Sequence, residues 1–491
     1  IFKYLLHSHN MDILQDFIKT LSKEEFKSYK LFVKRTHNFD SRKDIELFDS
    51  IKKHGDETDT FHNKAIYKTA KADAKYYRLK NKIVDDLGVV ITNLNHRKPE
   101  LDVLHLLSIA KIFNSKKQFE LAIHYLKLAE RKASEKEDFA ILEAIYEQMI
   151  RLSLQNVELP PTEIIEKRNE NSQRLKLLQD LENNLAVLSY EVKTTQNLTP
   201  KKAITDWLNQ TLKNTLKLSY VKTSAQLRIK TFQNLSRLML LLNDYVSLEA
   251  YLKTCLVEFE NDGIFKKETH DIKLQLLVYL CNASFVLNKH NQSLQYASDL
   301  NANLKAYSKQ NHDQYLFYYY NILVMNYTKT NLEKALDTLL EAQQQPVIKS
   351  NPTNYFYVLN NLAITYFDLK RNKLASKFFS QMYISQNYKS FDEIFKFKLS
   401  LFELINKIEM QDVDASQKLI GQLEKAQTSI KEKESIKQDS ILIKLLHSYL
   451  FKYNAKWRPV KKDIEKFITD YPIDERQSGI INYSNWLQEK V

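Results

Sequence analysis

Glycine, proline and cysteine are scarce in this chain of 491 residues, which holds 5 glycines, 8 prolines and 2 cysteines. Strands joined by tight hairpins depend on turn residues, and on glycine above all, because many such turns require a positive φ. The shortage of glycine therefore predicts helices joined by short polar loops, which is an all-α fold.

The same shortage excludes several motifs of catalysis and nucleotide binding. The sequence has no G-x-G-x-x-G fingerprint and no G-x-x-x-x-G-K-[ST] phosphate loop, and none of its 12 histidines stands in H-E-x-x-H. Cys255 and Cys281 fall on apolar helix faces without a Cys–His pattern, so we expect small buried side chains. His7 and His9 lack the second cluster that a metal site needs. The sequence predicts no enzyme, no cofactor and no metal.

Long apolar runs are also absent. No stretch approaches the roughly 18 consecutive apolar residues of a membrane span. The first ten residues, IFKYLLHSHN, have no small-residue cleavage site. We treat residues 1–10 as an extension of uncertain status before Met11. Because the chain has only two cysteines, we expect a reducing compartment and a cytoplasmic protein.

The composition is that of a folded globular chain, with 43% apolar and 27% charged residues. The net charge is +13, but a protein dedicated to nucleic acid usually concentrates its positive charge on one face. Only one stretch of this sequence does so.

Residues 11–99 are predicted to form a four-helix N-terminal head. The first apolar stripe has the three- and four-residue spacing of a helix and consists of Ile13, Leu14, Phe17, Ile18 and Leu21. Ser22-x-x-Glu25 predicts a capping box at the start of the next helix. The stretches LSKEEFKSYKLFVKR and YYRLKNKIVDDL are loosely similar to the heads of uncharacterised repeat proteins from Bacteroidetes, a resemblance that implies no activity.

A basic stripe is predicted on the last helix of this head. Its cations are spaced by three or four residues: Lys64, Lys68, Lys71, Lys75, Arg78 and Lys82. On one continuous helix they would extend over about 27 Å. Two interpretations stay open, a solvated face whose lysine stems cover apolar surface, or a surface for an anionic partner such as nucleic acid. No helix-turn-helix pattern accompanies the stripe, so nucleic acid is possible but not favoured.

Residues 100–450 contain a repeat of helical hairpins. Each unit has an apolar-periodic helix, a short polar turn and a second helix that opens on a small residue. These small residues are Ala122, Ser293, Ala335, Ala375 and Ala415. From Ser293 onward they recur about every 40 residues, a period typical of stacked supersecondary units. Short side chains let the two helices of a unit approach closely.

This pattern resembles the tetratricopeptide repeat. Leu359, Leu362, Ala363 and Tyr366 match its first helix, and Ala375, Phe379 and Met382 match its second helix. The period of about 40 residues is longer than the roughly 34 residues of that family. The resemblance implies a right-handed superhelical solenoid over residues 100–450, closed by capping helices in residues 451–491.

The resemblance also implies where a ligand binds. First helices line the concave groove of such solenoids, which here gives Asn282, Phe285, Tyr320, Tyr327, Asn360, Ile364 and Phe367. Asparagine can pair with both N–H and C=O of an extended peptide, and aromatic rings supply contact area. Each ring is either a core residue or a groove residue. The function expected is a non-catalytic scaffold for a protein or peptide partner; the alternative is a regulator whose basic helix contacts nucleic acid while the repeats sense a peptide or protein.

Overall fold

The computed structural model describes most of the chain. The described residues are 12–36, 42–55, 57–69, 72–96, 98, 101–155, 159–194, 218–385, 388–389, 391, 393–430, 436–471 and 483–490. Within these ranges the secondary structure is helical throughout and contains no strand. The prediction of an all-α fold is confirmed for this part of the chain.

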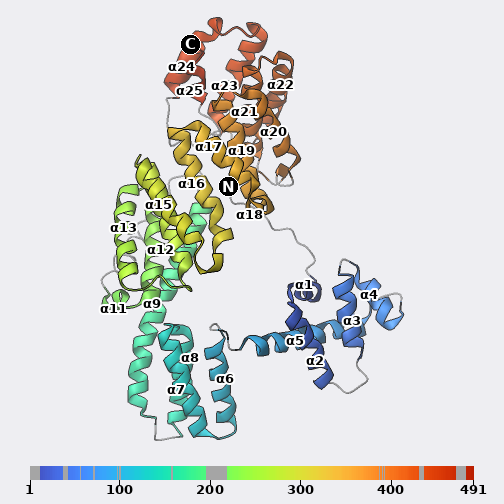
Figure 1. The fold of residues 1–491 in the computed structure, drawn as a ribbon, viewed down its shortest axis with the longest axis vertical. Coiled ribbons are helices and arrows are strands. Elements are labelled where there is room, and N and C mark those ends of the chain that lie inside the picture. Colours follow the sequence, from blue (N-terminus) through green and yellow to red (C-terminus); the bar gives the residue numbers. More distant parts are fainter. Residues whose placement is uncertain are drawn as a thin grey trace. The chain divides into compact units, whose positions relative to one another are not determined.

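The chain divides into two compact units, whose helices are labelled in Figure 1. Unit 1 comprises Ile1–Asn197 and Asp206–Thr231, and unit 2 comprises Leu198–Thr205 and Phe232–Val491. The boundary falls inside helix α12, which spans Ala225–Leu241. Each unit is described here by itself.

The N-terminal head in unit 1 has five helices in its described residues, where the sequence predicted four. They are α1 (Ile13–Thr20), α2 (Lys23–Thr36), α3 (Arg42–Lys53), α4 (Asp59–Tyr67) and α5 (Ala74–Asn95). Tyr29, Phe48 and Tyr76 are fully buried in their shared core. The capping box is confirmed, because the Ser22 amide donates to Glu25 Oε2 at 2.8 Å and the Glu25 amide donates to Ser22 Oγ at 3.2 Å.

The rest of unit 1 contains helices α6 (Asp102–Ser115), α7 (Phe119–Glu135), α8 (Phe139–Ser153) and α9 (Pro161–Thr194), which pack in chain order, and the short helix α11 (Ser219–Thr223). Helix α7 packs against both α6 and α8, and α8 packs against α9. Three fully buried alanines of α7 permit this close approach, Ala122, Ala129 and Ala133.

Unit 2 continues the same arrangement with the C-terminal part of α12 and the helices that follow (Figure 1). They are α13 (Tyr245–Asn261), α14 (His270–Val286), α15 (His290–Leu304), η1 (Tyr307–Lys309), α16 (His312–Thr330), α17 (Leu332–Gln344), α18 (Pro346–Ser350), α19 (Pro352–Asp368), α20 (Asn372–Ile384), α21 (Glu393–Glu409), α22 (Val413–Ser429), α23 (Lys437–His447), η4 (Ser448–Lys452), η5 (Arg458–Val460), α24 (Lys461–Asp470) and α25 (Tyr483–Gln488). From α13 to α17 each helix packs against the helix before and after it, and the same holds from α19 to α23.

The small residues that were predicted to mark a repeat lie mostly at buried positions. Ser293, Ala335 and Ala375 are fully buried. Ala415 is only half-buried, and its neighbour Ser416 occupies the fully buried position. The predicted register is therefore wrong by one residue in the α21–α22 hairpin, because Ser416 lies five residues after the left-handed Gln411, as Ala375 lies five residues after the left-handed Lys370.

Most turns between successive helices use a left-handed residue other than glycine, and Gly263 has this role before α14. The residues with positive φ in six such turns are Lys117, Glu137, Asn243, Asn288, Lys370 and Gln411. In each turn the next amide closes a bond to the carbonyl five residues earlier, as Asp412 N does to Lys407 O at 3.1 Å. This geometry explains how so many helices are joined in a chain with five glycines.

None of the helices in the described ranges carries an apolar run long enough to cross a bilayer.

Candidate functional site

The predicted basic stripe does not lie on one helix. Helix α4 ends at Tyr67, the next residue Lys68 is left-handed with φ 56°, and α5 begins only at Ala74. Asp73 caps α5, because its carboxylate accepts the amides of Lys75 and Tyr76 at 3.0 and 3.1 Å. The expectation of a continuous helix is wrong because aspartate is a strong N-cap. Lys71 lies outside the described residues.

One cation of the stripe points inward. Lys82 Nζ lies 2.8 Å from Asp44 Oδ2, and the Asp44 side chain is 2% exposed. Lys64, Lys75 and Arg78 are exposed, as is Lys68 in the turn. The exposed cations of the stripe therefore lie on α4, on α5 and in the turn between them. That they bind an anionic partner stays a hypothesis.

Lys80, which the stripe does not include, holds the head together. Its Nζ lies 2.7 Å from both Asp12 and Asp59, and only 12% of its side chain is exposed. Burial raises the Asp12 pKa, but the Lys80 ammonium and the Gln15 amide together outweigh burial and lower that pKa. Tyr76 Oη adds a 3.0 Å hydrogen bond to Asp59. These charges join α1, α4 and α5 and are structural.

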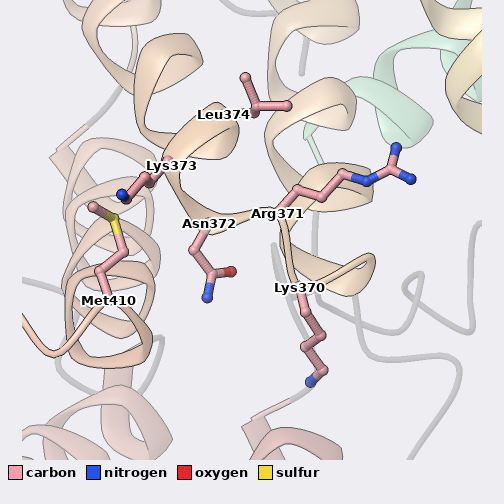
Figure 2. Close-up of a pocket in the computed structure, with 6 residues that line it drawn as sticks. All are labelled: Lys370, Arg371, Asn372, Lys373, Leu374 and Met410. Atoms are coloured by element: carbon pink, nitrogen blue, oxygen red, sulfur yellow. The ribbon is translucent and has the colours of Figure 1, made fainter.

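A pocket of about 440 Å³ lies at the turn between α19 and α20 (Figure 2). Its lining is Lys370, Arg371, Asn372, Lys373, Leu374 and Met410. Lys370 pairs with Glu489, and Arg371 pairs with Glu333 at 2.6 Å. Figure 2 shows the Arg371 side chain turned away from Met410. Because two of its three cations already have carboxylate partners, we assign no ligand to this pocket.

A second surface is built from one repeated pattern on α14, α16 and α19. Each helix carries four uncharged residues at spacings of four, three and four. They are Gln275, Tyr279, Asn282 and Val286 on α14; Gln314, Tyr318, Asn321 and Met325 on α16; and Thr353, Tyr357, Asn360 and Ile364 on α19. The first, second, third and fourth residues of the pattern are each equally spaced along the sequence from helix to helix; the tyrosines, for example, are at 279, 318 and 357. We call this set the Tyr-Asn face.

The Tyr-Asn face is accessible on all three helices. All twelve of its side chains are half-buried or exposed, and Tyr318 is 43% exposed. The residues between them are mostly core; on α14, for example, Leu276, Leu277 and Cys281 are buried. A spacing of four, three and four residues is one stripe along a helix, so each helix presents one line of these side chains.

Direct contacts join the three helices near this face. Helix α14 packs against α16, and Tyr315 Oη donates to Asp271 O at 3.1 Å. The rings of Phe317 on α16 and Tyr357 on α19 meet edge to face with their centroids 5.5 Å apart. The repeated side chains therefore belong to helices that contact one another in sequence.

The amides of the Tyr-Asn face have unused hydrogen-bonding capacity. Oδ1 of Asn321 and Oδ1 of Asn360 are shielded from water and accept no hydrogen bond. Asn321 Nδ2 makes only a 3.5 Å contact with Met325 Sδ, a weak acceptor. A buried amide oxygen without a donor costs free energy, so both side chains would gain from a ligand that supplies an N–H group.

Two tyrosines of the face have defined polar surroundings. Burial raises the pKa of Tyr357. On α14, Gln275 accepts from Gln233 at 3.2 Å and donates to Tyr279 Oη at 3.1 Å. This short chain of polar groups fixes the Tyr279 ring at the first helix of the face.

The residues predicted from the resemblance divide between face and core. Asn282, Asn360 and Ile364 belong to the Tyr-Asn face. Phe285 and Tyr327 are half-buried beside it on α14 and α16; Phe285 contacts the His290 ring, and Lys334 lies over the Tyr327 ring.

Tyr320 and Phe367 are placed in the core. Tyr320 is 6% exposed and donates from its hydroxyl to Glu341 at 2.7 Å. Phe367 is 5% exposed and packs against the Phe402 ring. Neither residue lies on the Tyr-Asn face.

Sequence reasoning missed the three tyrosines of the face and Asn321. A signal was present, because YLCN, YYYN and YVLN repeat Tyr-x-x-Asn at equal intervals. The small residues of the second helices, Ser293, Ala335 and Ala375, are unequally spaced, which hid this register. The connections differ in length: three residues separate α14 from α15, whereas Asn331 alone separates α16 from α17.

The described ranges show neither a cluster of metal ligands nor an activated nucleophilic thiol. Those ranges hold no cluster of three or more His, Cys, Asp or Glu side chains that could bind a metal ion; His7 and His9 lie outside them. Cys255 and Cys281 are buried and form no disulfide, and burial raises the pKa of Cys281 to about 12. Such a thiol is not an activated nucleophile.

No protein-family model matches the chain, and no curated protein matches it.

Proposed function

We propose that the chain is a non-catalytic scaffold that binds a protein or peptide partner on a tetratricopeptide-like solenoid. In this proposal residues 100–450 wind as a right-handed superhelix and α24 and α25 cap it. The Tyr-Asn face of α14, α16 and α19 is then part of the concave binding surface. Two free cysteines fit a reducing compartment, so we propose that it works in the cytoplasm.

One observation supports this function most directly, the recurrence of the same four-residue pattern on three contacting helices. All twelve side chains of the pattern are half-buried or exposed, although most residues between them are core, so each helix offers the same groups to a partner. Tyrosine gives large contact area at a low cost in side-chain entropy and is enriched at binding hot spots. Repeat proteins present such side chains along an extended surface.

The nucleic-acid alternative has less support. Its stripe was expected on one helix, but Lys82 is paired internally and the exposed cations belong to separate elements. A phosphate backbone needs several cations along one track. We therefore keep the protein-binding function as the proposal.

Affinity capture with the tagged full chain tests this function. Proteins retained from the source cells are identified and then tested one by one in purified form. We expect direct binding to weaken at least tenfold for Tyr318→Ala and Tyr357→Ala, since hot-spot tyrosines contribute about 2 kcal/mol or more. Ile384→Ala, at a position 84% exposed on α20, is the matched control in the same unit.

The opposite result is equally informative. A purified partner that binds the two tyrosine variants as tightly as the wild type would place the binding surface elsewhere. Loss of binding only in Lys64→Gln and Lys75→Gln variants would move it to the head.

A further inference from the structure

We infer that residues 451–462 bind a single-stranded nucleic acid, with its phosphates on their cations and its bases stacked on their exposed rings. The stretch reads FKYNAKWRPVKK and runs from the end of η4 through η5 into α24. We call it the basic-aromatic turn. The inference goes beyond the proposed function, because this turn shares no residue with the Tyr-Asn face.

Positive charge is concentrated in the basic-aromatic turn. Its twelve residues include five cations and no acid, whereas the whole chain of 491 residues has a net charge of +13. The five cations are Lys452, Lys456, Arg458, Lys461 and Lys462, and all of them are exposed. They follow one another at intervals of four, two, three and one residues, so the helical spacing that predicted the basic stripe does not reveal them.

Three of these cations are available to a ligand. Within the described ranges Lys456, Arg458 and Lys462 form no ion pair with a carboxylate, and Lys461 Nζ is 4.0 Å from Glu465. A phosphate backbone is bound by several cations that lie within a short distance of one another. The basic-aromatic turn supplies such a group from a single short segment.

Stacked rings hold the turn against the C-terminal helices. The centroids of the Trp457 and Tyr449 rings are 3.9 Å apart, and Trp486 meets Trp457 edge to face at 5.7 Å. Ala455 N donates to Tyr449 O at 2.8 Å, and Val460 is fully buried. Apolar and backbone contacts therefore fix the segment before a ligand binds, which lowers the entropy cost of binding.

Two further rings of the turn can stack on bases. Phe451 is 46% exposed, and its ring contacts His447 with the centroids 4.7 Å apart. Tyr453 is half-buried, and Lys452 Nζ lies 5.2 Å from its ring centroid. Aromatic side chains beside a basic track bind single strands without regard to sequence, because every base has a flat face. A duplex keeps its bases stacked on each other, so only a single strand uses the rings as well as the cations.

An anionic membrane suits the turn less well. Surface anchors insert an apolar face rich in Trp, Phe or Leu roughly 5–10 Å into the bilayer. Trp457 is packed against Tyr449 and Trp486, so it cannot insert without leaving these contacts. Phe451 alone is a small anchor. Rings that lie at the surface among cations fit flat bases and phosphates better.

Fluorescence anisotropy with the full chain tests the inference. The probes are labelled oligouridylate and oligothymidylate of about 15 nucleotides, within the usual range of such sites. Each probe is titrated at several salt concentrations between about 50 and 200 mM. We expect the chain to bind at least one of them. Tighter binding of oligouridylate would identify RNA as the ligand, because the 2′-hydroxyl distinguishes RNA from DNA.

The expected result separates charge from stacking. Lys456→Gln, Arg458→Gln and Lys462→Gln together should reduce the slope of log affinity against log salt concentration by about two, since each phosphate contact on a single strand contributes about 0.7. Phe451→Ala should weaken binding about 5- to 100-fold and leave the slope unchanged, because it removes a ring and no charge.

Matched variants control for net charge and for the loss of an exposed ring. Lys373→Gln, Lys377→Gln and Lys425→Gln together remove three exposed cations from α20 and α22 in the same unit. Phe61→Ala removes a ring that is 42% exposed in the head. Neither control should change the affinity or the slope, and circular dichroism checks that every variant is folded.

Other outcomes overturn the inference in distinguishable ways. No binding of either probe would disprove it, and an equal decrease in slope for both triple variants would show that only the net charge attracts the strand. Duplex DNA bound as tightly as the single strands, with no effect of Phe451→Ala, would disprove base stacking. Phosphatidylserine vesicles bound in place of both oligonucleotides, through the same three cations, would replace the strand with a membrane. In each case the partner binding proposed for the Tyr-Asn face is unaffected, because it is measured on other residues.

Discussion

Lys82 Nζ lies 2.8 Å from Asp44 Oδ2, and this pair joins α5 to α3 inside the head. The carboxylate is almost fully buried, whereas 39% of the lysine side chain remains exposed. Lys82, which was predicted to belong to the basic stripe on the surface, therefore has a structural role in the head.

Lys82→Met should destabilise the head, because it leaves a buried carboxylate without its cation. We expect a loss of about 2–4 kcal/mol, as for other broken buried pairs. Hydrogen exchange of α3 and α5 peptides in the full chain measures the effect. Lys75→Met, at an exposed position of the same helix, is the control and should change exchange little; equal effects would contradict the assignment.

Gln411→Gly should stabilise unit 2, because Gln411 adopts φ 59° in the turn before α22. A residue other than glycine costs about 1–2 kcal/mol in the left-handed region, and the greater entropy of glycine in the unfolded chain offsets part of this gain. We expect a net increase of about 0.5–1 kcal/mol in urea unfolding. Gln411→Ala keeps the strain and should not stabilise; a gain as large as that of glycine would show that the turn is unstrained.

Ala375→Leu tests the close packing of the hairpins. Ala375 is fully buried, so a leucine must displace neighbours and should cost about 1–3 kcal/mol or more. Ala415→Leu is the matched control, because Ala415 is half-buried and Ser416 takes the core position. Thermal unfolding of the two variants measures the difference, and the same loss in both would mean that the two positions are equally packed.

Asp439→Asn should remove a pH dependence from the stability of unit 2. Asp439 is 3% exposed, accepts from Tyr483 Oη at 2.7 Å and has Lys398 Nζ only at 3.9 Å. Burial raises its pKa, with Lys398 and the Tyr483 bond opposing the rise. A raised folded pKa means that its stabilising contribution is present in acid and is lost as pH rises through that pKa.

The neutral variant keeps an oxygen that can accept from Tyr483. Its stability relative to the wild type should therefore grow as pH rises from the unfolded toward the folded pKa, by up to about 1.4 kcal/mol per pH unit. Urea unfolding followed by tryptophan fluorescence across the range where a raised carboxyl pKa titrates measures this difference. A difference that does not vary with pH would show that Asp439 keeps its charge without cost.

We expect that the affinity of the chain for duplex DNA does not depend on the exposed cations of the head. We expect Lys64→Gln, Lys75→Gln and Arg78→Gln together to leave the slope of affinity against salt concentration unchanged within about one unit. Each lysine or arginine that contacts a phosphate contributes close to one unit. A decrease of about three in the slope would restore nucleic acid as the partner of the head.

Local signals in the sequence predicted local structure well. Glycine scarcity predicted an all-α fold, and the Ser22–Glu25 capping box forms as expected because both partners are three residues apart. The N-cap Asp73 was an equally local signal, but it stood within a stretch with helical cation spacing and was overlooked. The five-helix head follows from that one residue.

Side-chain exposure was harder to predict than helix position. The α14 segment QLLVYLCNASFV is apolar nearly all round, so periodicity cannot say which line of residues faces outward. That choice depends on where α13, α15 and α16 pack against it. The same reason separates Tyr320, which the structure buries, from Tyr318 two residues earlier, which it exposes.

By itself, the sequence determined the all-α fold and the cap formed by Ser22 and Glu25, because these depend on composition and on residues a few positions apart. Only the tertiary structure decided that Lys82 reaches a carboxylate 38 positions away and that Asn282, Asn321 and Asn360 are half-buried on contacting helices. These relationships depend on distances between residues that are far apart in the sequence. Patterns over a few neighbouring residues do not determine such distances.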